Sequence, residues 1–260
     1  MEQILRMHQL PGLSKFEGVI HGFSDRSYGN QAFSVLGIKQ SPEQVKKNRI
    51  MFLNELGFSL ENGVAMYSEI PCAKQEVVIA EESFRGKGMT LLENAVKTEA
   101  LITNIKGLFL FLLTADCHPI IFYDPITHSI GLAHGSRQMT GEKLVIDVVE
   151  KMKQSFGTKQ ENLYVGIGPG IKKESYQLEY LDQMFHEKQF SKFVEKQSNG
   201  TFSLDLPSIN KELLAQYEVK EENIEISDID TARSPNYFSH YRDSRDGTKE
   251  ERFATAVMLK

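Results

Sequence analysis

Apolar residues recur at helical spacing in four segments of the chain. These segments are 41–57, 140–156, 179–196 and 207–217. The first gives the clearest pattern, because Ser41 is a good N-cap, Pro42 suits the first helical position and Gly57 favours the left-handed end of a helix. Gln44 lies three residues after Ser41, which predicts a capping box.

Short runs of β-branched and aromatic residues predict strands between these helices. The runs are 77–80, 100–103, 108–113, 120–123, 130–133, 164–167, 224–226 and 253–259. Several are apolar at consecutive positions, which is typical of sheets covered on both faces. The short connections between 108 and 133 favour antiparallel pairing of those strands. Together the patterns predict an α+β fold with layered, mixed sheets.

Composition narrows the class of protein. The chain has 260 residues, of which 40% are hydrophobic, enough for a substantial core without disulfides. It contains no internal repeat and no linker-like tract, so we expect a single domain over 1–260. The net charge of −5 and the absence of a basic stripe argue against nucleic-acid binding. This balance is typical of enzymes that act on small molecules.

The cysteines and the hydropathy indicate a compartment. Two cysteines, Cys72 and Cys117, cannot form a disulfide framework, which favours a reducing, cytoplasmic environment. The longest apolar run, 108–113, is far shorter than the ~20 residues that a membrane helix needs. We therefore expect no membrane association.

The strongest candidate chemistry follows the strand at 108–113. The segment Thr-Ala-Asp-Cys-His-Pro at 114–119 places Cys117 directly after that strand, and His134 ends the next strand but one. If both strands belong to one sheet, the two side chains can converge. A thiolate and an imidazole suit Zn²⁺, and they also suit a nucleophile and its base. On spacing alone, a buried cysteine and histidine that merely fill the core remain an alternative.

Several segments, taken in order, resemble one known family. They read HGFSDR at 21–26, VKKNR at 45–49, EALIT at 99–103, TADCHPI at 114–120, AHG at 133–135, IGPGI at 167–171, FSHYRD at 238–243 and RFA at 252–254. They are similar to the motifs of the multicopper polyphenol oxidoreductase or laccase-domain family. Some members of that family are described as purine nucleoside phosphorylase/adenosine deaminases, and some bacterial members as peptidoglycan-editing factors. The resemblance implies a single-domain α/β/β/α layered sandwich.

The resemblance also implies a metal centre, zinc or copper, held by one Cys and two His. Cys117 and His134 occupy two of these positions. The segment that carries the other His in the family corresponds here to 68–75, which contains no His. Three interpretations follow: Cys72 is the third ligand; Cys117 and His134 act without metal as a thiolate–imidazolium pair; or the site has degenerated. We carry the first as a hypothesis, against the alternative that Cys72 is a small apolar residue beside Pro71.

For activity, the resemblance implies chemistry on purine nucleosides, either phosphorolysis or deamination. Arg26 and Arg242 match family arginines and are candidates to bind phosphate or a substrate carboxylate, with a surface ion pair as the alternative. Two further functions stay open: a cysteine-dependent hydrolase or amidase of the peptidoglycan-editing type, and a non-catalytic family member. A multicopper oxidase is disfavoured, because the seven His residues are scattered and form no His-x-His pair.

Overall fold

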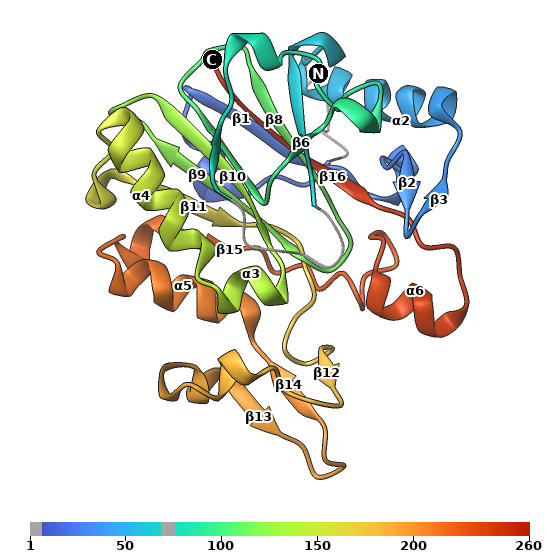
Figure 1. Cartoon of the computed structure of the whole chain (residues 1–260), viewed down its shortest axis with the longest axis vertical. Helices are drawn as coiled ribbons and strands as arrows, with labels where there is room; N and C mark the ends of the chain where they lie inside the picture. The colour runs from blue at the N-terminus through green and yellow to red at the C-terminus, as the bar shows by residue number, and fades with distance from the viewer. Residues whose placement is uncertain (1–6, 69–75) are drawn as a thin grey trace.

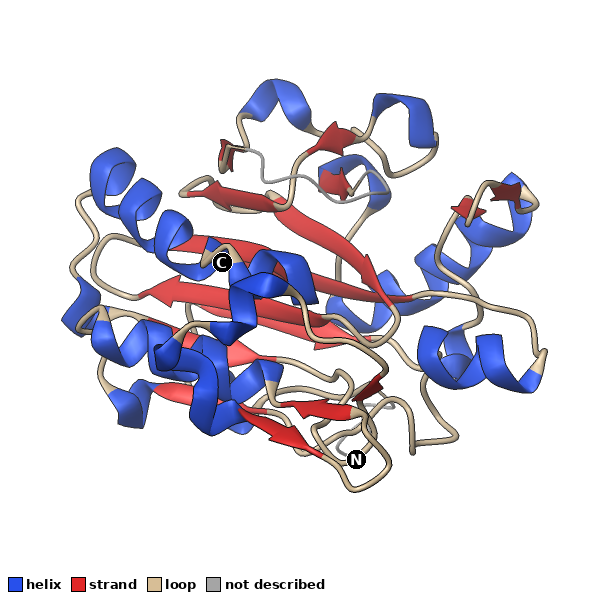
Figure 2. Cartoon of the chain, turned by 60° about the horizontal axis from the view of Figure 1, so that its bottom comes forward, coloured by secondary structure: helices blue, strands red, loops and turns tan. Residues whose placement is uncertain are grey.

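Two mixed β-sheets lie face to face at the centre of the computed structural model, which describes residues 7–68 and 76–260. Helices lie outside the strands in both views of the chain (Figures 1 and 2). In spatial order the five-stranded sheet contains β1 (Val19–Phe23), β16 (Phe253–Leu259), β8 (Phe109–Thr114), β4 (Gly63–Tyr67) and β6 (Val96–Lys97). The six-stranded sheet contains β15 (Ile224–Ile226), β11 (Tyr164–Ile167), β9 (His118–Asp124), β10 (Ser129–Gly135), β7 (Ala100–Thr103) and β5 (Val78–Ile79).

Strand alternation explains the layering. In β8, Leu110 and Leu112 point inward and pack against the other sheet, while Phe109 and Phe111 point outward. The outward face packs against α2 (Pro42–Leu56). The outer face of the six-stranded sheet packs against α4 (Leu144–Phe156) and α5 (Leu206–Gln216). The order of layers is therefore α/β/β/α, as the family resemblance implied.

The remaining elements are short. Two small sheets are formed by β2 (Ser34–Val35) with β3 (Ile38–Lys39), and by β12 (Gln177–Leu178), β14 (Phe202–Leu204) and β13 (Val194–Lys196). The second of these projects from the body of the molecule at the bottom of Figure 1. The short helices are α1 (Pro11–Ser14), α3 (Arg137–Gly141) and α6 (His240–Asp246).

The helix predictions have mixed outcomes. α2 begins and ends where predicted: the Ser41 side chain accepts from the Gln44 backbone N–H, and Gly57 has φ +73°. The capping box is incomplete, because the Gln44 side chain donates to Asn48 instead of returning to Ser41. The helix expected at 140–156 begins later, at Leu144, and the one expected at 207–217 is α5.

The helix expected at 179–196 is wrong. The segment forms two 3₁₀ turns, Gln183–His186 and Lys188–Phe193, followed by β13. Its two fully buried apolar side chains, Phe185 and Phe190, are five residues apart, a spacing that does not keep both on one face of an α-helix. They reach the core from separate turns.

All eight predicted strands are present, but one pairing is wrong. β9 and β10 pair antiparallel, as expected. β8 and β9 do not pair: β8 lies between β16 and β4 in the five-stranded sheet, and β9 belongs to the six-stranded sheet. Their short connection crosses from one sheet to the other. Within the described residues, no helix is both long and apolar enough to cross a membrane.

Candidate active site

A three-residue crossover between the two sheets carries Cys117. Residues 115–117 connect the end of β8 to the start of β9. Asp116, in the middle, has φ +84°, a backbone conformation that few non-glycine residues adopt. Such a conformation persists only where the surroundings fix it. Cys117 is a free thiol and is partly exposed.

The contacts of Asp116 supply that constraint. Its Oδ1 accepts a hydrogen bond from Thr231 Oγ1 at 2.7 Å, and its Oδ2 accepts from the Tyr241 backbone N–H at 2.6 Å. Its backbone carbonyl accepts from the Ile171 N–H at 2.9 Å. Burial raises the pKa of Asp116, and the hydrogen bonds to the carboxylate oppose that rise. Asp116 therefore fixes the backbone next to Cys117.

His118 fixes the crossover on the other side of Cys117. Its ring is fully buried, with Nδ1 3.1 Å from the Gly168 carbonyl oxygen and Nε2 3.0 Å from that of Ile171. Burial lowers the pKa of His118 to about 4. A Cβ at Gly170 would overlap this ring, which explains the glycine in that loop.

His134 lies at the end of β10, almost fully buried, and meets Cys117 there. Burial by itself lowers the pKa of His134. The neighbouring Cys117, through charge and a side-chain hydrogen bond, and Glu99 outweigh burial and raise that pKa well above 6.5. Cys117 and His134 thus converge, although the expectation of a single sheet was wrong: β8 and β10 belong to different sheets. The side chains meet because Cys117 immediately precedes β9, whose first residues pair with the end of β10, His118 with Gly135 and Pro119 with His134.

Glu99 is the site residue that sequence reasoning missed. His134 Nδ1 lies 2.6 Å from Glu99 Oε2, and the Glu99 side chain is fully buried. The Ser68 hydroxyl bonds the other Glu99 oxygen and lies 3.2 Å from His134 Nδ1. These contacts occupy Nδ1 and leave Nε2 as the nitrogen available to Cys117 or to a ligand. The signal in the sequence was a carboxylate immediately before a strand of four buried residues.

An aromatic pair lies beside the crossover. The rings of Tyr176 and Tyr241 have centroids 6.1 Å apart in an edge-to-face arrangement. Tyr176 interacts electrostatically with Arg137 and Cys117, and burial raises the pKa of its phenol to about 12. Arg137 itself pairs with Asp182, Nε to Oδ2 at 2.8 Å.

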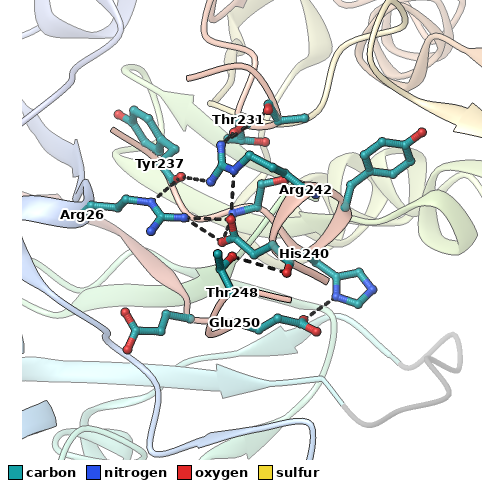
Figure 3. Close-up of polar contacts among 12 residues, drawn as sticks. Arg26, Thr231, Tyr237, His240, Arg242, Thr248 and Glu250 are labelled. Atoms are coloured by element: carbon teal, nitrogen blue, oxygen red, sulfur yellow. Dashed lines mark hydrogen bonds and ion pairs between the residues drawn. The ribbon is translucent and has the colours of Figure 1, made fainter. Parts of the chain in front are cut away.

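The structure places Arg26 and Arg242 in a network of protein acceptors (Figure 3). Arg26 donates to both Asp243 oxygens, at 2.9 and 2.7 Å, and to the Tyr237 carbonyl. Arg242 donates to Asp243 and to the carbonyls of Thr231, Ser234 and Tyr237. Both guanidinium groups therefore hold the α6 region to the body of the chain.

The described residues bring together two side chains of metal-ligand type. Thiolate and imidazole are zinc ligands, and a metal-bound His commonly places its other nitrogen on a carboxylate, as His134 does with Glu99. Within residues 7–68 and 76–260, no group of three or more His, Cys, Asp or Glu could hold a metal ion. Cys72, the hypothesised third ligand, lies outside the described residues.

The fold and the site together agree with the family that the chain matches. Residues 16–260 match the family described as multi-copper polyphenol oxidoreductase laccase, and the chain belongs to this family. The family description implies copper-related metal binding among its members.

Individual relatives point the same way. The purine nucleoside phosphorylase YlmD of Bacillus subtilis is 30% identical over 68% of this chain and 64% of its own length, so the match spans just under two thirds of that relative. A purine nucleoside phosphorylase of Bacteroides thetaiotaomicron is 24% identical over 98% of this chain and 96% of its own. Among solved structures, YlmD of Geobacillus stearothermophilus has a TM-score of 0.85 at 23% identity, covering 100% of this chain and 98% of that one. It supports the fold. YfiH of Bacillus licheniformis has a TM-score of 0.84 at 25% identity over 93% of each chain.

Proposed function

We propose that this protein is a purine nucleoside phosphorylase whose site is formed by Cys117, His134 and Glu99. The observation that carries the proposal is the convergence of thiol, imidazole and buried carboxylate where β8 and β10 end. Membership of a family with relatives named purine nucleoside phosphorylase supports the choice of substrate.

The proposed reaction exchanges one bond for another. A phosphate oxygen attacks the anomeric carbon C1′ of the ribose, the C1′–N9 bond breaks, and its electron pair leaves with the purine, which then takes up a proton. In the metal-free protein, the raised pKa of His134 favours its protonated form. An imidazolium in a largely buried site stabilises a phosphate anion or a departing base. Glu99 keeps the ring oriented and charged.

We propose zinc, with copper as the alternative, as the metal of this site, held by Cys117, His134 and Cys72. In the metal-bound form His134 would be a neutral ligand, in place of the imidazolium of the metal-free form. The Glu99–His134 contact supports the imidazole as a ligand. A bound zinc ion would supply a Lewis acid, and with it a route to deaminating adenosine through an activated water. Because the described residues provide only two of the three protein ligands of a catalytic zinc site, we assign no phosphorolytic step to the metal.

A nucleoside panel tests the proposed activity. Adenosine, inosine and guanosine are incubated with the purified protein, with and without inorganic phosphate, and the products are read by mass spectrometry. We expect a free base and ribose 1-phosphate only when phosphate is present. Cys117→Ala and His134→Gln should abolish release, while the exposed His186→Gln should not change it. No base from any nucleoside would refute the proposal, and inosine formed from adenosine would add the deaminase activity.

Elemental analysis of the freshly purified protein tests the metal separately. We expect about one zinc per chain, and a lower content in Cys72→Ala and Cys117→Ala. An unchanged content in Cys72→Ala would remove Cys72 from the ligand set.

The arrangement of Cys117, His134 and Glu99 favours a second candidate function, a cysteine hydrolase or amidase. Cys117, His134 and Glu99 follow the order of nucleophile, base and orienting acid. The test is turnover of a muropeptide amide by metal-free protein. Hydrolysis that is lost on alkylation of Cys117 would favour this candidate, and the absence of hydrolysis would remove it.

A further inference from the structure

We infer that Tyr176 is a specificity and catalytic residue of this site, whose hydroxyl donates a hydrogen bond to the purine base as the base departs. The inference rests on the proposed function. The Tyr176 hydroxyl has no hydrogen-bond partner among the described residues. Tyr176 is half-buried in the site, so this donor is available to a bound molecule.

The position of Tyr176 is fixed from two directions. Its backbone N–H donates to the Lys172 carbonyl at 2.9 Å, and the neighbouring Ile171 N–H donates to the Asp116 carbonyl. Its ring packs edge-to-face against Tyr241, whose backbone N–H donates to the Asp116 carboxylate at 2.6 Å. Both anchors therefore lead to the residue that precedes Cys117. A side chain held this way can orient a substrate without first becoming ordered.

Tyr241 differs from Tyr176 in what its hydroxyl contacts. The Tyr241 hydroxyl donates to the Gln177 carbonyl at 3.3 Å, so the protein itself uses that hydroxyl. The two rings pack together, yet only the Tyr176 hydroxyl has no such acceptor among the described residues.

Several charged groups face the Tyr176 phenol from different elements. Arg137 at the start of α3 and Cys117 in the crossover interact with it, as do Asp182 and Asp116. A phenol carries its proton at neutral pH, so the Tyr176 hydroxyl acts as a neutral donor. It can donate to a ring nitrogen or carbonyl oxygen of a purine.

The chemistry of phosphorolysis gives that donor a role. When the C1′–N9 bond breaks, its electron pair spreads over the purine and increases the negative charge on N7 and on the exocyclic oxygen. A hydrogen bond that strengthens as this charge develops stabilises the transition state more than the bound substrate. The phenol keeps its proton throughout, and the released base takes its proton from water.

Tyr176→Phe removes only the hydroxyl and tests the inference on two substrates. The first is inosine, and the second is 7-methylinosine, whose methylated, positively charged base leaves without help at N7. We expect kcat for inosine to fall about 10- to 100-fold, with kcat for 7-methylinosine within about threefold of wild type. The thermal midpoint should stay unchanged, since the hydroxyl has no hydrogen bond to lose among the described residues. Tyr217→Phe is the control. It also removes one phenol hydroxyl, but that hydroxyl bonds Glu150 on α4 and is not proposed to contact the base.

The outcomes separate the two claims. If the wild type releases no base, the proposed function fails and the inference about Tyr176 fails with it. If the wild type is active and Tyr176→Phe matches it on inosine, only the inference fails. An equal loss on both substrates would also overturn it, because it would show that the hydroxyl supports the site without acting on the base.

Discussion

His134 has one ring nitrogen directed at a carboxylate and the other free for chemistry. The 2.6 Å contact with Glu99 fixes the ring and, together with Cys117, favours its charged form. We expect Glu99→Gln to reduce phosphorolysis about 10- to 100-fold, because an amide neither neutralises the imidazolium nor holds the ring as firmly. Steady-state kinetics with inosine measures the effect.

The pKa of His134 provides a second readout for this variant. Loss of the Glu99 charge removes one of the causes that raise it, so the pKa in Glu99→Gln should be lower than in the wild type, as followed by NMR of the ring protons. Glu142→Gln, at a residue between α3 and α4 whose side chain accepts from Gln138, is the control. Unchanged kinetics and an unchanged His134 pKa in Glu99→Gln would show that Glu99 only fills the core.

The sequence predicted those site residues whose side chains are chemically rare. Cys117 and His134 stood out because thiols and imidazoles are rare and each followed a strand. Glu99 and Tyr176 did not stand out, because carboxylates and phenols are common and their roles depend on which residues approach across the sheets. Arg26 and Arg242 matched family arginines, but only the structure shows the Asp243 and carbonyl acceptors that hold them. Whether they also meet substrate stays a prediction.

At the scale of elements, Arg26 and Arg242 hold α6 to the rest of the chain. Arg242 is largely buried and pairs with Asp243, whose side chain is 2% exposed. Arg242→Gln should lower the free energy of unfolding by about 3 kcal/mol, since the substitution weakens the compensation of a buried carboxylate. Urea denaturation measures the change. Arg233→Gln, at a side chain that is 66% exposed, should change stability by less than about 0.5 kcal/mol.

A substrate-binding role for Arg242 predicts a different result. In that case stability would be near wild type and KM for phosphate would rise. A folded, fully stable Arg242→Gln protein with a raised KM would therefore contradict the structural role.

The loop after β11 is shaped by the His118 ring. Gly170→Ala would place a Cβ against a fully buried imidazole that two carbonyl contacts hold in place. We expect a loss of about 1–3 kcal/mol in unfolding free energy and a drop in activity, because His118 is next to Cys117. Chemical denaturation and the inosine assay measure the two effects.

Gly131→Ala in β10 is the matched control. Its Cβ would lie 3.3 Å from Ile102 and Val148 side-chain atoms, which can adjust slightly. We expect a smaller loss there, below about 1 kcal/mol. Equal losses in the two variants would show that the His118 ring moves more easily than its contacts suggest.

Short-range sequence signals, such as helix caps, predicted the helices better than they predicted which strands pair. The boundaries of α2 were correct because Ser41, Pro42 and Gly57 act within a few residues of themselves. The helix predicted at 179–196 was wrong because tertiary packing of Phe185 and Phe190 determines the turns of this segment. The crossover from β8 to β9 could not be read from loop length, since three residues can close a hairpin or carry the chain between two stacked sheets.

At the scale of the whole molecule, the layer order followed from alternation and composition. Strands with buried residues on both faces require cover on both sides, and two sheets with outer helices satisfy that requirement. The site lies where the chain crosses between the sheets: Cys117 ends the crossover from β8, and the pairing of β9 with β10 places it beside His134. The pair of side chains is thus brought together by strand pairing within the six-stranded sheet.

His21 on β1 makes the stability of this assembly depend on pH. It is 1% exposed, and its Nε2 accepts the Leu10 backbone N–H at 2.8 Å. Burial, with a smaller contribution from His8, lowers the pKa of His21 to about 4, against 6.5 when unfolded. As pH falls from 6.5 to 4 the unfolded chain binds a proton that the folded chain does not. Acid should therefore reduce the free energy of unfolding by about 1.4 kcal/mol per pH unit, or about 3 kcal/mol over that range.

The His21→Gln variant isolates this contribution from the other titrating groups. Its amide oxygen can accept from Leu10 but does not titrate. Urea denaturation of both proteins at pH 7, 5.5 and 4.5 should show the stability advantage of the wild type shrinking, and then reversing, as pH falls. The exposed His186→Gln should give a difference from wild type that does not vary with pH. A similarly constant difference for His21→Gln would show that His21 gains its proton at the same pH in the folded and unfolded chains, so that β1 stays anchored in acid.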